Sequence, residues 1–306
     1  MTNSSGPSPL RGVFAAAVTP LTPTLAPDLD ALPALLDFLA GRGCHGVLLL
    51  GTTGEGTSFS VDERLAVVRA GLAHRAAAHP HLKLLAGTDC ASLADTITLT
   101  RAAFDLGVDG VVTLPAFYYK NLGAEGLVAY FDAVIREAVP EHGRLLAYHI
   151  PQMSGVPVPD EAVLHLRQLH PRRFFGMKDS QDELPHTLQT LRAAPGFALF
   201  CGSDSIMAES LAAGAFGSIT ALANITAPLN RLVWDAHQRD ESAPDAQARL
   251  AQARVVIRGL NGPAAMKATL SDLFGMPDWP VRPPLQPLAA PQRAKLAAGL
   301  AALLNT

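Results

Sequence analysis

Eight short apolar segments recur along the chain, and helical patterns separate them. They are residues 12–20, 46–54, 82–89, 110–115, 145–151, 174–180, 197–204 and 217–224. Each is too short for a helix and ends in Gly, Pro, Thr, Ser, Asp or Asn, which favour turns. Near-continuous apolar strands are typical of a parallel sheet that is covered on both faces. The repeated β–α alternation therefore predicts a (β/α)8 TIM barrel. An open doubly wound sheet is the alternative, although its Gly-rich GxGxxG turn is missing.

The segments between the apolar runs carry helix signals. Residues 60–78 begin with Ser60 and have Glu63 three positions later, which predicts a capping box. Residues 92–107 show an apolar stripe and end in Gly, a suitable C-cap. Residues 159–170 place Pro and acids in the first turn and His at the end, which suits the helix dipole.

The pattern changes near residue 230, where the alternation gives way to helical segments separated by a Pro-rich stretch. We therefore expect a catalytic barrel over residues 11–232 and a small C-terminal helical subdomain over residues 233–306. Residues 1–10, MTNSSGPSPL, are expected to form a loose N-terminal tail.

Composition narrows the functional class. The chain has 306 residues, a formal net charge of −3 and no Lys/Arg run, so we expect no nucleic-acid partner. The N-terminus has no signal-peptide pattern, and no uncharged apolar run is long enough to cross a membrane. The three cysteines, Cys44, Cys90 and Cys201, fit no zinc or CxxC spacing. The simplest interpretation is a reduced, cytoplasmic protein.

In a barrel of this kind the active site lies at the carboxyl ends of the strands. The polar and aromatic residues expected there are Thr52, Thr53, Phe117, Tyr118, Tyr119, Tyr148, Lys178, Ser203 and Asp204. This set contains one amine, several hydroxyls and few acids. It lacks the cluster of acids and histidines that a metal-dependent barrel enzyme needs, so we predict no metal site there.

The amine is the most informative member. Lys178 stands near the end of the apolar run RRFFGMKDS, where a charged group must be paired, snorkelling or kept neutral for chemistry. A neutral amine is a nucleophile, and we expect Phe174, Phe175 and Met177 to supply apolar surroundings that favour it. Attack on a 2-oxo acid gives an iminium, which is an electron sink. We expect the other lysines to be solvated; they are Lys83, Lys120, Lys267 and Lys295.

Two further features fit the same chemistry. Tyr148 is a candidate proton shuttle, and the turn GTTGEG at residues 51–56 offers N–H groups and hydroxyls to a carboxylate. His149 should point away from Tyr148, toward the helices. Glu55 is given a structural role in its loop.

Each candidate also has a purely structural interpretation. Lys178 can snorkel, Tyr148 can be an ordinary core tyrosine, and the turn at residues 51–56 can be only a tight connection. Asp204 can cap the next helix, and the aromatic residues 117–120 can form an interface patch.

Four motifs together resemble the dihydrodipicolinate synthase/N-acetylneuraminate lyase family. They are GTTGE at residues 51–55, FYY at residues 117–119, Tyr148 in YHIPQMSG and Lys178 in GMKDS. The resemblance runs from GVFAAAVTPLTP to VRPPLQPL, nearly the whole chain. It implies a class I, metal-free, pyruvate-type lyase without a cofactor. It also implies a homotetramer built from tight dimers.

The resemblance assigns a role to each motif. Lys178 is the Schiff-base lysine, and Tyr148 transfers protons above the bound pyruvate moiety. Thr52 joins the hydroxyl relay, which Tyr119 completes from a neighbouring subunit. Thr53 and the adjacent N–H hold the substrate carboxylate. The substrate-binding residues that we expect are Thr53, Gly54, Ser180, Gly202 and Asp204.

Two positions depart from the synthases and the sialic acid lyases. Met153 stands where the synthases have an arginine that grips aspartate semialdehyde, and a thioether cannot do this. Asp204 matches an acid that sialic acid lyases use for substrate hydroxyls, but Ser205 replaces the Glu that follows it. We therefore expect a shorter hydroxylated 2-oxo acid, such as a 2-keto-3-deoxy sugar acid or a 4-hydroxy-2-oxoglutarate-like compound.

Three functional hypotheses remain open from the sequence. The first is a Schiff-base aldolase that cleaves such a 2-oxo acid to pyruvate and an aldehyde, or runs in reverse. The second keeps the imine for condensation or dehydration, as a dihydrodipicolinate synthase or a keto-deoxy sugar acid dehydratase. The third is a barrel that binds a 2-oxo acid without turnover.

Overall fold

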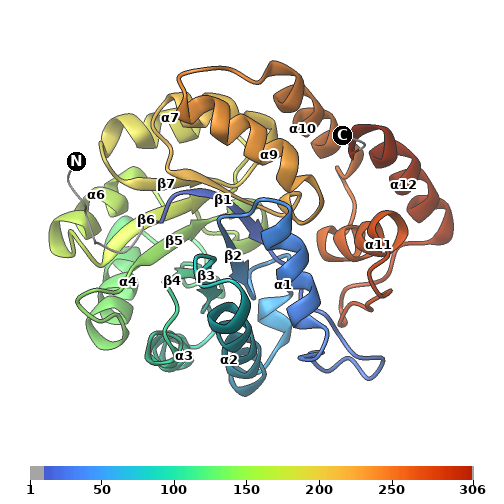
Figure 1. Cartoon of the computed structure of the whole chain (residues 1–306). Coiled ribbons are helices and arrows are strands. Elements are labelled where there is room, and N and C mark those ends of the chain that lie inside the picture. The colour runs from blue at the N-terminus through green and yellow to red at the C-terminus, as the bar shows by residue number, and fades with distance from the viewer. Residues whose placement is uncertain (1–9, 305–306) are drawn as a thin grey trace.

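Eight parallel strands form a closed barrel in the order β1 to β8 in the computed structural model, which describes residues 10–304 (Figure 1). The strands are β1 Gly12–Ala16, β2 Gly46–Leu49, β3 Lys83–Gly87, β4 Gly110–Thr113, β5 Leu145–His149, β6 Phe174–Asp179, β7 Ala198–Cys201 and β8 Gly217–Thr220. Each lies within one of the eight apolar segments. The predicted (β/α)8 barrel is confirmed.

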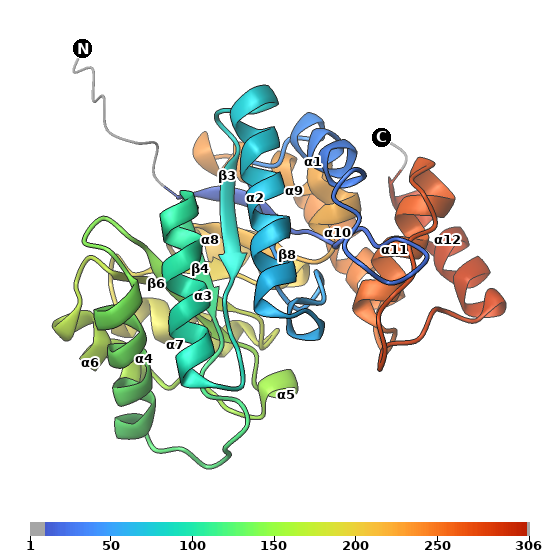
Figure 2. The ribbon, with the colours of Figure 1, turned by 90° about the horizontal axis from the view of Figure 1, so that it is seen from below.

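Helices surround the strands, and the last of them lie beside the barrel (Figures 1 and 2). The helices are α1 Leu32–Gly41, α2 Val61–Ala78, α3 Leu93–Leu106, α4 Ala124–Ala138, α5 Pro151–Ser154, α6 Asp160–Leu169, α7 Leu184–Ala193, α8 Met207–Ala212, α9 Ala223–Gln238, α10 Pro244–Val256, α11 Gly262–Phe274 and α12 Ala290–Leu304. Short 3₁₀ helices cover Gly56–Ser58 (η1) and Asp204–Ile206 (η2). Helix α10 packs on α9, and α11 packs on α12.

Local sequence explains the helix ends. Ser60 and Glu63 form the predicted capping box at the start of α2, each bonding the other's backbone N–H. Helix α3 ends at Gly107, whose φ of 98° lies in the left-handed region that glycine adopts without strain. Both predicted boundaries are therefore confirmed.

The apolar core has two layers, because side chains alternate along each strand. Phe14, Leu48 and Phe200 belong to the cluster inside the barrel. Val13 and Val47, their neighbours along β1 and β2, belong to the cluster between the strands and the helices. The inner cluster also contains Tyr148, so this alternation decides which polar residues at the strand ends face the barrel axis.

Two predicted boundaries need revision. Most of the predicted tail lies outside the described residues, but Leu10 is fully buried in the inner cluster and cannot belong to a loose tail. The predicted division between residues 232 and 233 falls inside the continuous helix α9. We propose that the C-terminal subdomain begins after Gln238. None of the helices within residues 10–304 has the length and apolarity that a membrane crossing needs.

Candidate active site

Lys178 and Tyr148 face each other at the carboxyl ends of β6 and β5. The register pairs the two residues directly. The Lys178 amine donates to the Tyr148 hydroxyl at 2.9 Å and lies 4.1 Å from the centre of its ring. The Tyr148 oxygen is also 3.2 Å from the Thr52 hydroxyl. Both Lys178 and Tyr148 are only 3% exposed. One chain of polar groups, buried at Lys178 and Tyr148 and partly buried at Thr52, thus joins three of the predicted catalytic residues.

The apolar surroundings of Lys178 differ from the prediction. Phe174 and Met177 belong to the outer cluster and pack toward the helices. Phe175 contacts the inner cluster, and its ring packs edge-on against Phe216. A register shift on β5 opposite the start of β6 interrupts the simple alternation. The residue paired with Lys178 on β7 is Phe200, which belongs to the inner cluster and which the sequence did not single out.

Ser180 and Gly202 lie side by side, where β6 and β7 end. The Gly202 N–H donates to the Asp179 carbonyl at 2.6 Å. A Cβ at Gly202 would stand 2.0 Å from the Ser180 hydroxyl oxygen and 2.6 Å from the Asp179 carbonyl oxygen. Only glycine fits here without displacing these groups. The close approach brings two predicted substrate-binding residues together, since Ser180 lies two residues beyond Lys178 and Gly202 lies one residue beyond Cys201.

The loop after β2 presents unused backbone donors. The N–H groups of Glu55 and Gly56 donate to the carbonyls of Thr52 and Gly51. Within the described part of the chain, the N–H groups of Thr53 and Gly54 donate to no protein acceptor. Such adjacent free donors are what a carboxylate requires.

Glu55 anchors this loop, which confirms its expected structural role. Its backbone is left-handed, with a φ of 57°. Its carboxylate, 0% exposed, accepts from the Lys267 amine at 2.5 Å and from the Arg282 N–H at 2.7 Å. Lys267 is 1% exposed, so the prediction that it is solvated was wrong. The C-terminal region therefore holds the loop that carries Thr52.

Tyr119 lies on the loop after β4 and is 68% exposed. Its ring meets that of Tyr118 edge-on, with centroids 5.4 Å apart. Lys120 fixes the loop by donating to the carbonyls of Phe117 and Ser154. Among the described residues of one chain, the Tyr119 hydroxyl makes no hydrogen bond to Thr52 or Tyr148. Its contribution from a neighbouring subunit stays a prediction.

A group behind the site escaped the sequence reasoning. His149 points to the helices as expected, and its ring stacks on that of His186 with centroids 4.3 Å apart. Asp179 accepts from His186 at 3.0 Å and from Thr187 at 2.7 Å. The hydrogen bond that His186 donates to Asp179 raises the pKa of His186. The available signal was the position of His149 and Asp179, one residue after Tyr148 and Lys178.

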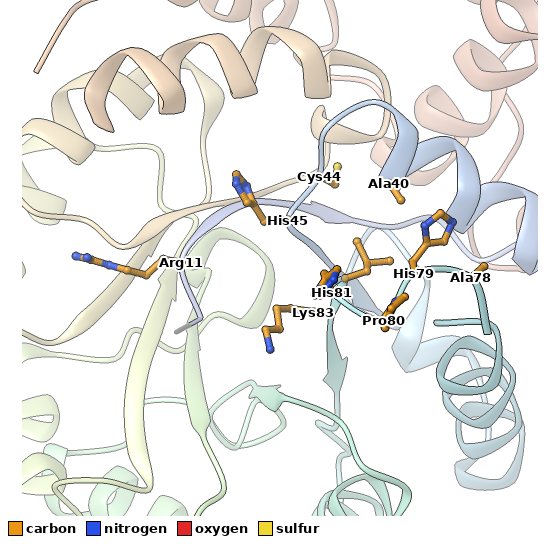
Figure 3. A pocket seen from close by; sticks show the side chains of 10 residues that line it. Arg11, Ala40, Cys44, His45, Ala78, His79, Pro80, His81 and Lys83 are labelled. Carbon is orange, nitrogen blue, oxygen red and sulfur yellow. The ribbon is translucent and has the colours of Figure 1, made fainter. Parts of the chain in front are cut away.

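A separate cavity of about 420 Å³ opens at the other end of the barrel, where β1, β2 and β3 begin (Figure 3). Its lining includes Arg11, His45, His79, His81 and Lys83. None of the predicted site residues lines it.

Comparisons with known proteins identify the family of the chain. Residues 9–303 match the model of the dihydrodipicolinate synthetase family. The chain belongs to that family. An uncharacterised DapA-like lyase of Chloroflexus aurantiacus is 42% identical over 94% of this chain and 95% of that protein. The 4-hydroxy-tetrahydrodipicolinate synthase 1 of Streptomyces coelicolor is 34% identical over 94% and 92%.

A solved structure of the family supports the same assignment. The N-acetylneuraminate lyase of Proteus mirabilis is 26% identical, covers 96% of this chain and 98% of its own, and superposes with a TM-score of 0.85. The predicted family is confirmed, and so is the prediction that the chain is an enzyme of the lyase type.

Two positions that bear on the choice of substrate, Met153 and Asp204, lie in the segments that follow β5 and β7. Met153, on α5, is 67% exposed and follows directly from β5. Asp204 is 2% exposed, and its carboxylate accepts from Thr220 at 2.8 Å and Asn230 at 2.7 Å. Burial raises the pKa of Asp204. The role of Asp204 in binding substrate hydroxyls stays a prediction.

Proposed function

We propose that this lyase forms an imine between Lys178 and a 2-oxo acid, and that it cleaves a hydroxylated 2-oxo acid to pyruvate and an aldehyde, or joins the two. The single observation that carries the proposal is the chain of hydrogen-bonding groups from the buried Lys178 amine through the Tyr148 hydroxyl to Thr52. An amine held against a hydroxyl relay has both the nucleophile and the proton path that imine chemistry needs.

The first half of the reaction builds the imine. The neutral amine of Lys178 attacks the C2 carbonyl, and the oxygen takes a proton to give a carbinolamine. The hydroxyl then takes a proton from Tyr148 and leaves as water, and the nitrogen lone pair forms the iminium double bond. Tyr148 lies 2.9 Å from the amine, close enough to pass protons in both directions, and Thr52 continues the path at 3.2 Å.

The second half breaks the C3–C4 bond. The C4 hydroxyl gives its proton to the Tyr148 oxygen, the electrons of the O–H bond form the aldehyde carbonyl, and the C3–C4 bonding pair moves to the iminium to give an enamine. The aldehyde leaves. Protonation at C3 and addition of water then release pyruvate and restore the amine. The reverse sequence gives condensation.

The carboxylate of the 2-oxo acid needs donors beside the amine. We assign this task to Thr53 and to the free N–H groups of Thr53 and Gly54, which lie next to Thr52. Ser180 and Gly202 form the opposite wall, where β6 and β7 end. A carboxylate held in this way fixes C2 relative to Lys178, because it removes the rotational freedom of the bound acid.

The proposed substrate class follows from the residues at positions 153 and 204. Met153 cannot form a bidentate pair with a second carboxylate. A keto-deoxy sugar acid with a single carboxylate makes no such demand, whereas 4-hydroxy-2-oxoglutarate carries a second carboxylate and would have to bind without an arginine at this position. Thr220 and Asn230 both donate to Oδ1 of Asp204, so Oδ2 is the oxygen that we assign to a substrate hydroxyl.

A second candidate keeps the imine but condenses pyruvate with aspartate semialdehyde, as the name of the Streptomyces coelicolor relative implies for that protein. A dehydratase acting through the same imine is a further variant. Turnover of aspartate semialdehyde identifies the condensation, whereas the products from a keto-deoxy sugar acid or 4-hydroxy-2-oxoglutarate separate the other two: an aldolase releases pyruvate and an aldehyde, and a dehydratase releases water and keeps the carbon chain intact. The non-catalytic hypothesis is less economical, because a binding protein has no need of a lysine within 2.9 Å of a tyrosine hydroxyl.

We also propose a homotetramer of tight dimers, in which Tyr119 reaches the relay of its neighbour. The support is an exposed aromatic pair, Tyr118 and Tyr119, on a loop beside the site. Light scattering measures the assembly. A fully active monomer would contradict the role given to Tyr119.

The decisive experiment is reduction with borohydride in the presence of pyruvate, followed by peptide mass spectrometry. We expect a reduced pyruvyl adduct on Lys178 that is absent without pyruvate. Lys178→Ala should abolish the adduct, whereas the matched control Lys295→Ala, at an exposed position, should leave it unchanged. Undiminished turnover in Lys178→Ala would overturn the proposal.

A further inference from the structure

Three side chains with metal-ligating atoms converge on the outside of the barrel, away from the proposed active site. Asp37 comes from α1, His74 from α2, and His79 is the residue at which α2 ends. The Nε2 atoms of His74 and His79 lie 2.6 Å and 2.7 Å from the same Asp37 oxygen, Oδ1. The two rings meet edge-on, with centroids 5.8 Å apart. Two imidazole nitrogens and one carboxylate oxygen thus point at one small volume.

This convergence is more than a surface ion pair requires. A single hydrogen bond to either histidine would satisfy Asp37, yet both rings turn the same nitrogen to the same oxygen. The three ligand atoms lie within 4.8 Å of one another. Tetrahedral zinc with bonds of about 2.0–2.2 Å holds its ligand atoms about 3.3 Å apart. Small outward rotations of the side chains would therefore admit an ion.

The second group of this kind, His149 with Asp179 and His186, offers a useful contrast. Both ring nitrogens of His149 are already engaged, Nδ1 with the Val158 N–H at 3.0 Å and Nε2 with Gln181 at 2.6 Å. That group is largely buried and committed to protein partners. The group on α1 and α2 is partly exposed, so water can complete the coordination of an ion there.

We propose that Asp37, His74 and His79 form a binding site for a divalent transition-metal ion of the Zn²⁺ type. Two imidazoles and a carboxylate suit Zn²⁺, Cu²⁺ and Ni²⁺, whereas Mg²⁺ and Ca²⁺ prefer all-oxygen sites. The ion bridges α1 and α2, which pack against each other. It acts on structure, because α2 ends at the opposite end of the barrel from Lys178.

The surroundings of His79 give the ion access to small molecules. His79 lies both in the cluster and in the wall of the cavity of about 420 Å³, beside Ala40 and Ala78 (Figure 3). Coordination positions that the protein leaves open are therefore within reach of water or a small anion. The site is independent of the proposed aldolase chemistry, so the two proposals can fail separately.

Titration of the full-length, tag-free, chelator-treated protein with ZnCl₂ tests the proposal by calorimetry. We expect one equivalent per chain at micromolar or lower concentration. His74→Ala, His79→Ala and Asp37→Asn should each weaken binding by about 100-fold or more. His165→Ala, a matched change at an exposed histidine on α6, should leave binding unchanged. Cys90→Ser should also have no effect.

A spectroscopic readout guards against variants that merely misfold. Co²⁺ bound at the site should give visible absorption bands that vanish in His74→Ala, while the borohydride adduct on Lys178 is retained. Two results would overturn the proposal. The first is one equivalent of Zn²⁺ bound as tightly by a variant that combines Asp37→Asn, His74→Ala and His79→Ala as by the wild type. The second is no Zn²⁺ binding below millimolar concentration by the wild type.

Discussion

The hydroxyl of Tyr148 is the part of the proposed site that a single substitution isolates best. Tyr148→Phe keeps the ring, and with it the contact of 4.1 Å to the Lys178 amine. It removes the oxygen that accepts from Lys178 at 2.9 Å and contacts Thr52 at 3.2 Å. The substitution therefore separates proton transfer from packing.

Its magnitude follows from these two contacts. Loss of a positioned proton shuttle lowers a rate by about 10²–10⁴-fold. The substitution also leaves the buried Lys178 amine without its acceptor. An unsatisfied buried donor lowers the free energy of unfolding by about 1–3 kcal/mol. We expect a folded variant that still forms the adduct on Lys178 but does so slowly, with turnover at least about 100-fold below the wild type.

Exchange of the pyruvate methyl hydrogens for deuterium, followed by NMR in D₂O, is the suitable assay. Formation of the enamine removes a proton from C3, so exchange reports the imine cycle without knowledge of the aldehyde partner. The rate of spontaneous exchange without enzyme is subtracted. Lys178→Ala, which cannot form the imine, is the inactive control. An exchange rate in Tyr148→Phe within about threefold of the wild type would refute the relay, because proton shuttles contribute far more.

Three further predictions concern two ion pairs, Lys267–Glu55 and Arg282–Glu63, and the residue at position 153. Lys267→Met leaves the buried Glu55 carboxylate without its cation. The free energy of unfolding, measured by urea denaturation, should therefore fall by about 3–5 kcal/mol. A decrease of less than about 1 kcal/mol would contradict the anchoring role. Met153→Arg supplies the missing carboxylate partner, so the KM for aspartate semialdehyde should fall about tenfold, and an unchanged KM would count against the assignment of this position. Hydrogen bonds from Arg282 lower the pKa of Glu63 from 4.5 to about 2. Because the folded-state pKa is the lower one, the stabilisation is present above pH 4.5 and is lost as the pH falls toward about 2. Glu63→Gln should therefore flatten the acid limb of the stability profile, and an identical limb in the variant would exclude this pair as its source.

The barrel and its helix ends were predictable because their signals are local. Eight apolar runs gave eight strands, and the Ser60–Glu63 spacing gave the start of α2. Lys178 and Tyr148 were also predictable, since both stand at strand ends and alternation sends both inward. The direction of a side chain at the end of a strand follows from the alternation of side chains along that strand, so it can be predicted from local sequence.

The errors came from information that is not local. The burial of Lys267 depends on Glu55, which lies 212 residues earlier in the chain. The position of Phe174 depends on a register shift between two strands, which no pattern within one strand reveals. The convergence of Asp37 with two histidines depends on how α1 packs on α2. In each case the deciding partner is distant in sequence.

The alternation that places the reactive side chains also provides their anchors. Tyr148 pairs with Lys178 inside the barrel, and the next pair along the same strands is His149 with Asp179, facing the helices. A residue that follows a reactive one must point outward, so its contacts fix the backbone from which the reactive side chain extends. His149 is held by Val158, and Asp179 by Thr187. One register therefore places both the reactive pair inside the barrel and the hydrogen-bonded pair that faces the helices. We expect a substitution at His149 or Asp179 to shift the positions of Tyr148 and Lys178.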